Sequence, residues 1–248
     1  MLFSIITVTL NNRSGLARTA GSISRQTHKD FQWIIVDGAS TDGTPQDARL
    51  YQATVISEPD KGIYDAMNKG LDIAQGSYVI FLNAGDCFAE AETLEKIQAA
   101  ILQNHPDFIY GDSWELAKEK LNYKTARHHS RICTGMFTHH QAMIYKREII
   151  SQLLYDLNYA IAADYDFTIR YLKSAQTCLY LNIPLCIFES GGVSQQNVKI
   201  GRKEQFIIRQ KSSVVSKLQN IAIYLAQVLN WRVRYFMPAL YWKLKKFR

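Results

Sequence analysis

Three short acidic segments each place a carboxylate where it could take part in chemistry. The segment Val36–Thr44 reads V-D-G-A-S-T-D-G-T, so that Asp37 follows an apolar run and precedes a turn of small residues. Such a turn lets a nucleotide approach the backbone closely, and the carboxylate can accept a hydrogen bond from a base or a ribose hydroxyl. The same pattern also fits an ordinary strand-to-helix turn capped by Asp42 or Thr44.

The segment Ile80–Asp86 ends an apolar run with an amide and a carboxylate. Asp86, with a neighbouring oxygen of Asn83, could hold a divalent cation, because magnesium and manganese take few protein oxygens and complete their coordination with substrate phosphates. Such an ion would neutralise charge on a leaving diphosphate. A single carboxylate can equally cap a helix, so this segment alone does not establish a metal site.

A third acidic pair, Asp164 and Asp166, begins a predicted helix over 164–173. Residues two apart do not share a helix face, so one acid can point into a cleft while the other caps the helix. A positioned carboxylate could take a proton from a hydroxyl, although any helix N-terminus favours acids. The pair His139-His140 precedes a predicted strand over 141–145, and we expect His140 near an acceptor or a diphosphate.

A regular α/β scaffold is needed to position these segments. Runs rich in β-branched residues alternate with segments of helical spacing, which favours a mostly parallel, doubly wound sheet with flanking helices. Such sheets bind ligands at the carboxyl ends of their strands, where this sequence places polar residues. We predict strands at 3–10, 31–36, 54–57 and 78–82, and helices at 15–27, 44–52, 63–74 and 91–103.

The second half of the chain is less regular. We expect a hairpin or a mobile loop over 114–134, a strand-like segment over 177–188, a turn at Gly191-Gly192 and one long helix over 203–230.

Positive charge is concentrated near the C-terminal end. Residues 199–248 carry 12 Lys and Arg and one acid. Residues 1–198 carry 17 Lys and Arg and 21 Asp and Glu. Aromatic and basic residues interleave over 231–248, and no uncharged run is long enough to span a bilayer. We therefore predict a basic, aromatic, amphipathic helical tail over 199–248 that lies on an anionic membrane surface, with packing on the main domain as the alternative. No nucleic-acid motif is present, and we expect no nucleic-acid partner.

The order of the motifs resembles that of the family 2 glycosyltransferases of the GT-A fold. The resemblance covers residues 1 to about 198, which we take as the GT-A domain, a Rossmann-like domain with a mostly parallel central sheet. It is closest to the branch that acts in colanic acid and other bacterial surface-polysaccharide pathways. The matching segments are 4–12, 36–44, 57–70, 81–86, 139–146, 163–167 and 191–194.

The resemblance implies a role for each matching residue. A nucleotide-diphosphate-sugar donor would be bound by Thr7, Asn11, Asp37, Asp65 and Asn83. Asp86 would hold magnesium or manganese, Asp164 would be the catalytic base, and His140 and Ser194 would lie near the acceptor or the diphosphate. The sequence also departs from the family pattern. The common metal motif has acids where Asn83 and Gly85 stand, and the nucleotide segment often has an arginine where Met67 stands.

We therefore expect an inverting, metal-dependent glycosyltransferase. It would move one sugar from a UDP- or GDP-linked donor to a hydroxyl of a lipid-linked glycan, in exopolysaccharide, capsule or O-antigen biosynthesis, at the cytoplasmic face of the cell membrane. The alternative is a non-catalytic nucleotide or sugar binder on the same fold, which would not need Asp86 or Asp164. Nucleotidyl transfer to a sugar phosphate is a third reading, but Thr9–Leu16 does not resemble the phosphate loop it would require.

Overall fold

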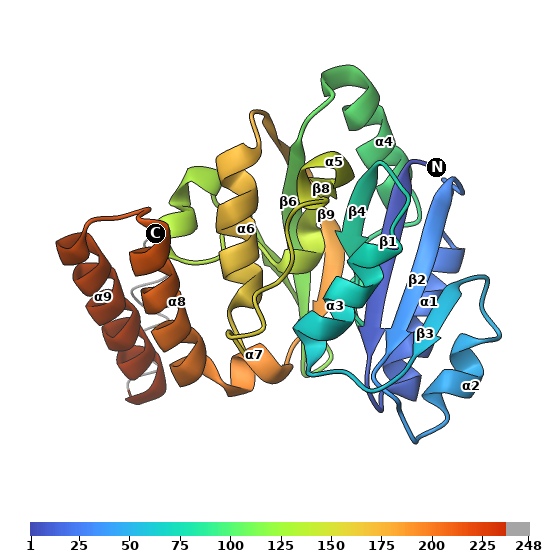
Figure 1. Cartoon of the computed structure of the whole chain (residues 1–248), viewed down its shortest axis with the longest axis horizontal. Helices are drawn as coiled ribbons and strands as arrows, with labels where there is room; N and C mark the ends of the chain where they lie inside the picture. The colour runs from blue at the N-terminus through green and yellow to red at the C-terminus, as the bar shows by residue number, and fades with distance from the viewer. Residues whose placement is uncertain (237–248) are drawn as a thin grey trace.

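The computed structural model describes residues 1–236 and is built on one nine-stranded sheet with the order β3-β2-β1-β4-β8-β6-β9-β5, in which β7 pairs with β6. The strands are β1 (Phe3–Thr9), β2 (Phe31–Asp37), β3 (Thr54–Ser57), β4 (Tyr78–Phe81), β5 (Cys87–Phe88), β6 (Phe108–Ala117), β7 (Lys120–Lys124), β8 (Met143–Lys146) and β9 (Cys178–Glu189). In Figure 1, β1–β3 lie at one end of the molecule and helices α8 and α9 at the other.

The helices are α1 (Arg13–Ser24), α2 (Thr44–Ala48), α3 (Ile63–Asp72), α4 (Thr93–Asn104), α5 (Arg147–Ile150), α6 (Ala163–Ser174), α7 (Val193–Gln196), α8 (Val198–Ser212) and α9 (Lys217–Phe236), with 3-10 helices η1 (His129–Thr134) and η2 (His140–Ala142).

The predicted parallel sheet is confirmed for the first four strands, whereas the rest of the sheet is mixed. Strands β3, β2, β1 and β4 pair in parallel, and β8 runs antiparallel to both β4 and β6. Because β8 is reversed, the residues that precede it reach the edge where the parallel strands end. The reversal therefore brings 139–141 beside the segment that follows β4.

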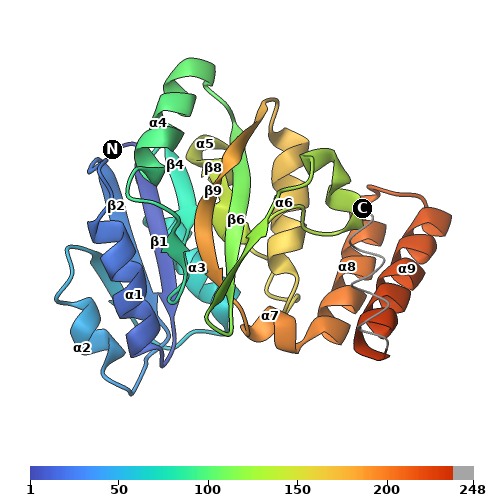
Figure 2. The ribbon, with the colours of Figure 1, turned by 180° about the vertical axis from the view of Figure 1, so that it is seen from behind.

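Two hydrophobic cores cover the two faces of the sheet. One contains Leu16 and Ile23 of α1 with Leu94 and Ile97 of α4. The other contains residues of α3, α6 and α8, and Figures 1 and 2 show these layers from opposite sides. Both sheet faces are thus buried, as expected for parallel strands that read as continuous apolar runs.

The predicted helix over 203–230 is wrong, because the chain forms two helices there. The helix α8 ends at Ser213, whose φ of 53° is left-handed. Ser216 and Gln219 then begin α9 with a reciprocal cap: the Ser216 backbone N–H donates to Gln219 Oε1 at 2.9 Å, and the Gln219 N–H donates to Ser216 Oγ at 3.3 Å. This S-x-x-Q pattern is a readable helix-start signal that the sequence analysis did not use.

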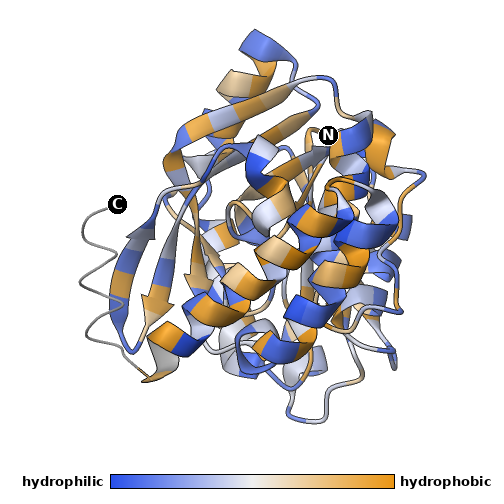
Figure 3. Ribbon diagram, turned by 90° about the vertical axis from the view of Figure 1, so that its left-hand side faces the viewer, coloured by the Kyte–Doolittle hydropathy of each residue, from blue (hydrophilic) through white to orange (hydrophobic). Residues whose placement is uncertain are grey.

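The outer side of α9 is apolar and exposed. Leu218, Ile221, Leu225 and Leu229, spaced three and four residues apart, are 47–81 % exposed. Figure 3, which looks onto this end of the molecule, shows hydrophobic and hydrophilic residues alternating along the outer helices. Over residues 1–236, no helix combines the length and apolar character that a membrane span requires. Of the tail predicted over 199–248, residues 237–248 lie outside the described part of the chain.

Candidate active site

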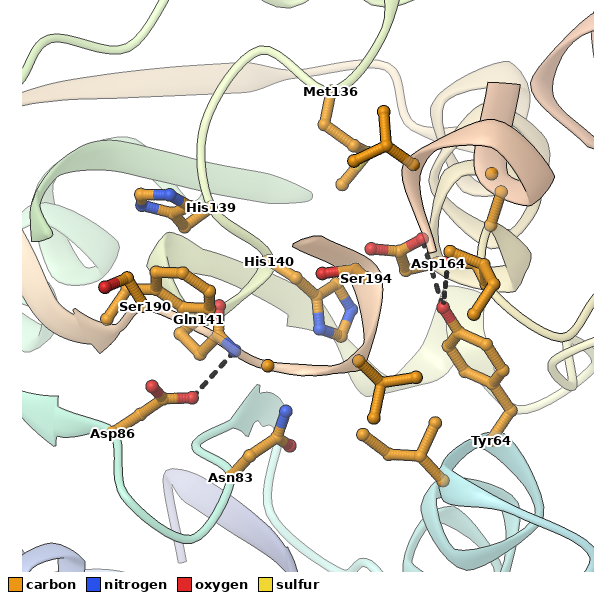
Figure 4. A pocket seen from close by; sticks show the side chains of 18 of the residues that line it. Tyr64, Asn83, Asp86, Met136, His139, His140, Gln141, Asp164, Ser190 and Ser194 are labelled. Atoms are coloured by element: carbon orange, nitrogen blue, oxygen red, sulfur yellow. Dashed lines mark hydrogen bonds between the residues drawn. The ribbon is translucent and has the colours of Figure 1, made fainter. Parts of the chain in front are cut away.

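A pocket of about 880 Å³ runs along the carboxyl ends of the parallel strands. Its walls come from the end of β1, the start of α3, the segment after β4, residues 134–141, the start of α6, the 188–194 loop, and α8 and α9. Five of the predicted site residues line it, namely Asn83, Asp86, His140, Asp164 and Ser194. In the view of Figure 4, Asp86 and Asp164 lie on opposite sides, with His140 and Ser194 between them.

Three buried polar atoms at this edge of the sheet have no hydrogen-bond partner among the described residues. They are Thr9 Oγ1 at the end of β1, Asp37 Oδ1 at the end of β2 and Asn83 Oδ1 after β4. Buried polar groups in native proteins are nearly always paired, so an unpaired cluster needs an explanation. A ligand that donates hydrogen bonds along this edge would provide one.

The predicted donor residues occupy different positions at this end of the molecule. Asp37 is fully buried and its Oδ2 accepts from the Ser40 N–H at 3.1 Å and from Ser57 Oγ at 2.7 Å. Its other oxygen is unpaired, as described above. Asp65 lies outside the pocket lining and accepts from the Lys61 N–H at 2.9 Å, near the start of α3.

Thr7 and Asn11 also lie outside the pocket lining. The Thr7 hydroxyl is buried and accepts from Trp33 Nε1 at 3.0 Å. Asn11 has a left-handed φ of 47°, and its Oδ1 accepts from the Thr41 N–H at 2.9 Å, which ties the β1 end to the loop after β2. The neighbours Thr9 and Asn12 line the pocket instead.

Asp86 is a buried carboxylate held by neutral donors. Its Oδ2 accepts from Gln141 Nε2 at 2.8 Å and its Oδ1 from the Glu189 backbone N–H at 2.9 Å. Burial raises the pKa of Asp86 to about 7, against the lowering effect of these hydrogen bonds. Gln141 was not among the predicted site residues, although it stands next to His140.

Glu189 approaches the backbone at Gly85. A Cβ atom at Gly85 would lie 2.3 Å from Glu189 Oε2, and Gly85 has a left-handed φ of 110°. Arg18 of α1 binds the same carboxylate oxygen at 2.6 Å. The absence of a side chain at Gly85 therefore leaves room for an acid that comes from the end of β9, and Glu189 itself lines the pocket.

Asp164 stands in the first turn of α6 at the pocket wall. Its Oδ1 accepts from the Tyr165 N–H at 2.8 Å and, more weakly, from Tyr64 Oη at 3.4 Å. Within residues 1–236, its Oδ2 accepts no hydrogen bond from the protein. Burial raises the pKa of Asp164 to about 6, which keeps the carboxyl mostly ionised at neutral pH while making it a better proton acceptor than an ordinary aspartate.

Glu204 of α8 fixes the segment that leads into α6. Its Oε1 accepts from the Ala160 N–H at 2.9 Å, and its Oε2 accepts from the N–H groups of Ile161 and Ala162 at 2.9 and 2.8 Å. These N–H groups belong to the N-cap residue of α6, Ala162, and to the two residues before it. No local sequence pattern signals this contact, because 42–44 residues separate the partners.

The two adjacent histidines have different surroundings. His140 is 7 % exposed, stacks on Phe81 and hydrogen-bonds through Nε2 to Tyr155 Oη at 2.9 Å. Burial lowers the pKa of His140 to about 3, so its ring is neutral at physiological pH. His139 also lines the pocket, stacks on Phe188 and pairs through Nδ1 with Ser113 Oγ at 2.8 Å. Ser194 lies in the short helix α7, directly after Gly191 and Gly192, and lines the pocket.

Within residues 1–236, no group of three His, Cys, Asp or Glu side chains is arranged to hold a metal ion. Three oxygen-bearing groups at the pocket could still ligate a cation: the Asp86 carboxylate, the unpaired amide oxygen of Asn83 and the nearby Glu189 carboxylate. This oxygen set suits a magnesium or manganese ion that takes its other ligands from a phosphate group or water.

We predict that Asp164→Asn stabilises the protein at alkaline pH. The folded-state pKa of about 6 exceeds the usual value of 3.8. The free energy of unfolding therefore falls as the pH rises from 3.8 towards 6, and the full loss of stability is reached above about pH 6. The variant should raise Tm by about 2–4 °C at pH 8 and by less at pH 4.5, as measured by thermal unfolding.

Asp166→Asn in the same helical turn is the matched control. It removes an ion pair with Arg170 Nε at 2.7 Å and should not raise Tm. An equal response of both variants at pH 8 would contradict a specific burial penalty at Asp164.

Known proteins are similar to this chain in sequence or in fold. A PGL/p-HBAD biosynthesis glycosyltransferase of Mycobacterium tuberculosis is 32% identical over 256 residues, which cover 94% of this chain and 98% of that protein. The structure of Staphylococcus aureus TarS superposes with a TM-score of 0.71 at 20% identity, covering 94% of this chain and 44% of TarS. The chain thus spans less than half the length of TarS.

Two ligand complexes have the same fold. TarS residues 1–349 with UDP-GlcNAc give a TM-score of 0.69 at 19% identity and cover 95% of this chain and 73% of that one. The mannosyltransferase PcManGT of Pyrobaculum calidifontis, in complex with GDP-Man and Mn²⁺, gives a TM-score of 0.64 at 15% identity. The match covers 92% of this chain and 74% of that one. These likenesses confirm the predicted GT-A fold.

The family model for glycosyl transferase family 2 matches residues 4–164, a range that begins in β1 and ends at Asp164. The chain therefore belongs to glycosyl transferase family 2.

Proposed function

We propose that this glycosyltransferase transfers one sugar from a nucleotide-diphosphate-sugar, with inversion at the anomeric carbon, to a hydroxyl of a lipid-linked glycan in bacterial surface-polysaccharide biosynthesis. The observation that carries the proposal is the placement of Asp164 and Asp86 on one pocket. A protein that only binds a nucleotide or a sugar has no use for a carboxylate whose pKa is raised towards neutrality and whose second oxygen lies free of protein donors.

The donor nucleotide is proposed to lie along the ends of β1, β2 and β4. Thr9 Oγ1, Asp37 Oδ1 and Asn83 Oδ1 are unpaired there and can accept hydrogen bonds from a base or a ribose. The complexes of similar proteins with UDP-GlcNAc and GDP-Man support a UDP- or GDP-linked donor. Thr7, Asn11 and Asp65 then act indirectly, by holding the strand ends and the α3 start in place.

In the proposed reaction Asp164 is the general base. It accepts the proton of the acceptor hydroxyl while the hydroxyl oxygen forms a bond to the anomeric carbon. The bond from that carbon to the diphosphate oxygen breaks, and its electron pair leaves with the nucleoside diphosphate. Attack from the face opposite the leaving group gives inversion. Neutral His140 and the hydroxyl of Ser194 can donate hydrogen bonds near the diphosphate or the acceptor.

A divalent cation, magnesium or manganese, is proposed as the cofactor. Asp86 and Asn83 would hold it, with Glu189 as a further acid that takes the place of a side chain at Gly85. When bound, the cation supplies positive charge to the leaving diphosphate. The Mn²⁺ in the PcManGT complex supports this proposal.

The proposed site of action is the inner face of the cell membrane. The exposed apolar side of α9 and the basic composition of 199–248 suit a helix that lies on an anionic lipid surface. In this proposal residues 1–198 carry the GT-A domain and the tail holds the pocket near a lipid-linked acceptor. The name of the mycobacterial relative, which refers to PGL biosynthesis, supports a lipid acceptor.

We predict that Asp164→Asn lowers kcat by about 10²–10⁴-fold, the usual contribution of a general base. Nucleotide affinity, measured by calorimetry, should stay within about twofold, because the donor residues lie at the other end of the pocket. In the wild type, kcat/KM should rise with pH and level off above about pH 6, where Asp164 is ionised. Asp166→Asn should keep its activity, and unchanged turnover in Asp164→Asn would exclude Asp164 as the base.

A second prediction concerns Glu204 as a positioning residue. Glu204→Gln puts an NH₂ group against the backbone N–H groups of 160–162, so kcat should fall about tenfold while nucleotide affinity is unchanged. Desolvation is the main reason for the raised pKa of Asp164, and the negative charge of Glu204 adds to it. The midpoint of the pH–rate profile should therefore move to lower pH.

Lys203→Gln, a change at the exposed neighbouring position, is the control for Glu204. A Glu204→Gln variant with lower kcat but an unshifted pH midpoint would show that Glu204 supports the fold without influencing the base.

The metal proposal is tested by calorimetric titration with UDP and GDP, each with and without manganese. Manganese should tighten binding of one nucleotide in the wild type, and Asp86→Asn should remove that increment. Asp42→Asn, which changes the same charge in the loop after β2, should retain it. Metal-independent binding of both nucleotides would contradict the proposed role of Asp86.

A further inference from the structure

The pocket extends well beyond the proposed donor end. Figure 1 places β1 and β2, whose ends carry the unpaired donor-side atoms, at one end of the molecule and α8 and α9 at the other. The pocket lining nevertheless includes Arg202 and Gln205 of α8 and Gln227 and Asn230 of α9. Asp164 belongs to α6, which packs against α8. The α8–α9 wall therefore lies on the side from which an acceptor would reach Asp164.

The α8 wall is joined directly to the segment before Asp164. A Cβ at Gly201 would lie 3.1 Å from Ile161 Cγ2, and Glu204 binds the N–H groups of 160–162. Arg202 lies between these two contact residues in the sequence. A group bound at Arg202 is thus held by the same helix that fixes the catalytic carboxylate.

Two arginines place positive charge at this end of the pocket: Arg202 on the α8–α9 wall, and Arg127 beside Thr134, whose carbonyl accepts from Gln227 of α9. Arg202 and Arg127 both line the pocket, and within residues 1–236 neither forms an ion pair. The Arg202 guanidinium lies 5.7 Å from the centre of the Trp231 ring, and burial lowers its pKa. Arg127 donates to Met136 O at 2.6 Å and to Thr134 Oγ1 at 3.2 Å, which fixes it beside the pocket.

Within residues 1–236, no acid forms an ion pair with either arginine. Asp86 and Glu189 lie on the donor side, Asp164 stands at the start of α6, and Glu204 accepts from three backbone N–H groups. A half-buried guanidinium without a carboxylate partner is stabilised most by an anionic ligand. Its planar set of N–H groups can donate two parallel hydrogen bonds to a phosphate or a carboxylate. Facing Gln205 of α8 and Gln227 of α9, Gly135 leaves open space in the pocket: a Cβ there would meet these two amides only at 3.9 Å.

We propose that the α8–α9 wall is an acceptor subsite in which Arg202, with Arg127, binds an anionic oxygen group of the acceptor, either a phosphate or a sugar carboxylate. The proposal rests on the proposed function and names a feature of its acceptor. It requires that the arginines serve the acceptor and not the donor diphosphate.

The test is calorimetric titration of the full chain with three probes that share one alkyl chain: octyl phosphate, octyl glucuronide and neutral octyl glucoside. Each titration is run with and without saturating UDP or GDP. At least one anionic probe should bind about tenfold more tightly than octyl glucoside. Because the alkyl chain is common to all three, contact with the apolar side of α9 cancels in the comparison.

Arg202→Met should abolish this preference, and Arg202→Lys should retain part of it. Lys199→Met is the matched control: Lys199 lies on the same helix, 5.6 Å from the same Trp231 ring, but outside the pocket lining. It should keep the full preference. Preference for the phosphate alone, for the glucuronide alone or for both supports the subsite and identifies the acceptor group.

Equal binding of charged and neutral probes to the wild type would overturn the proposal. So would equal losses in the Arg202 and Lys199 variants, or a loss of UDP or GDP affinity in Arg202→Met, which would assign the arginine to the donor. Failure of the wild type to bind either nucleotide would contradict the proposed function separately, since the probe titrations without nucleotide still report on the subsite.

Discussion

The three hydrogen bonds from residues 160–162 to Glu204 join the C-terminal helices to the rest of the molecule beside the proposed catalytic base. They join α8, from the C-terminal part of the chain, to the start of α6 and hence to Asp164. Because its partners are neutral backbone donors, Glu204 is held without a cation near the proposed base. A lysine or an arginine in that place would lower the pKa of Asp164, whereas Glu204 helps to keep it raised.

The same choice of neutral donors recurs around the pocket. Asp86 is held by an amide and a backbone N–H, and Asp37 by a backbone N–H and a hydroxyl. Burying a carboxylate without a cation lowers the stability of the folded protein. Such a loss is tolerated at a functional site, where a bound ligand or ion can offset it. Arg202 and Arg127 also line the pocket, and within residues 1–236 neither is paired with a carboxylate. The pocket therefore offers acids and cations that are not paired with one another, which suits a reaction with two different substrates.

Sequence reasoning succeeded where the information was local. The parallel strands, their polar ends and the acids that follow them are carried by short runs, and Asn83, Asp86, His140, Asp164 and Ser194 all reach the pocket. It was less informative where the position along a strand decides the outcome. Thr7 and Thr9 share one face of β1, but Thr7 lies inside the strand and bonds Trp33, whereas Thr9 ends the strand and lines the pocket. Partners remote in sequence, such as Gln141 for Asp86, leave no local signal at all.

The segment around Gly85 shows how a departure from a family pattern can be compensated from elsewhere in the chain. Read alone, L-N-A-G-D has lost acids that the common motif carries, and it suggests a weakened metal site. In the folded chain the left-handed glycine leaves space that the Glu189 carboxylate enters, and the Glu189 N–H holds Asp86 at the same time. One residue at the end of β9 thus supplies both negative charge and orientation. Because Arg18 binds that carboxylate from α1, the charge stays fixed beside the pocket. The negative charge of the motif is thereby kept at the same place in space, although it has moved by about a hundred residues in the sequence.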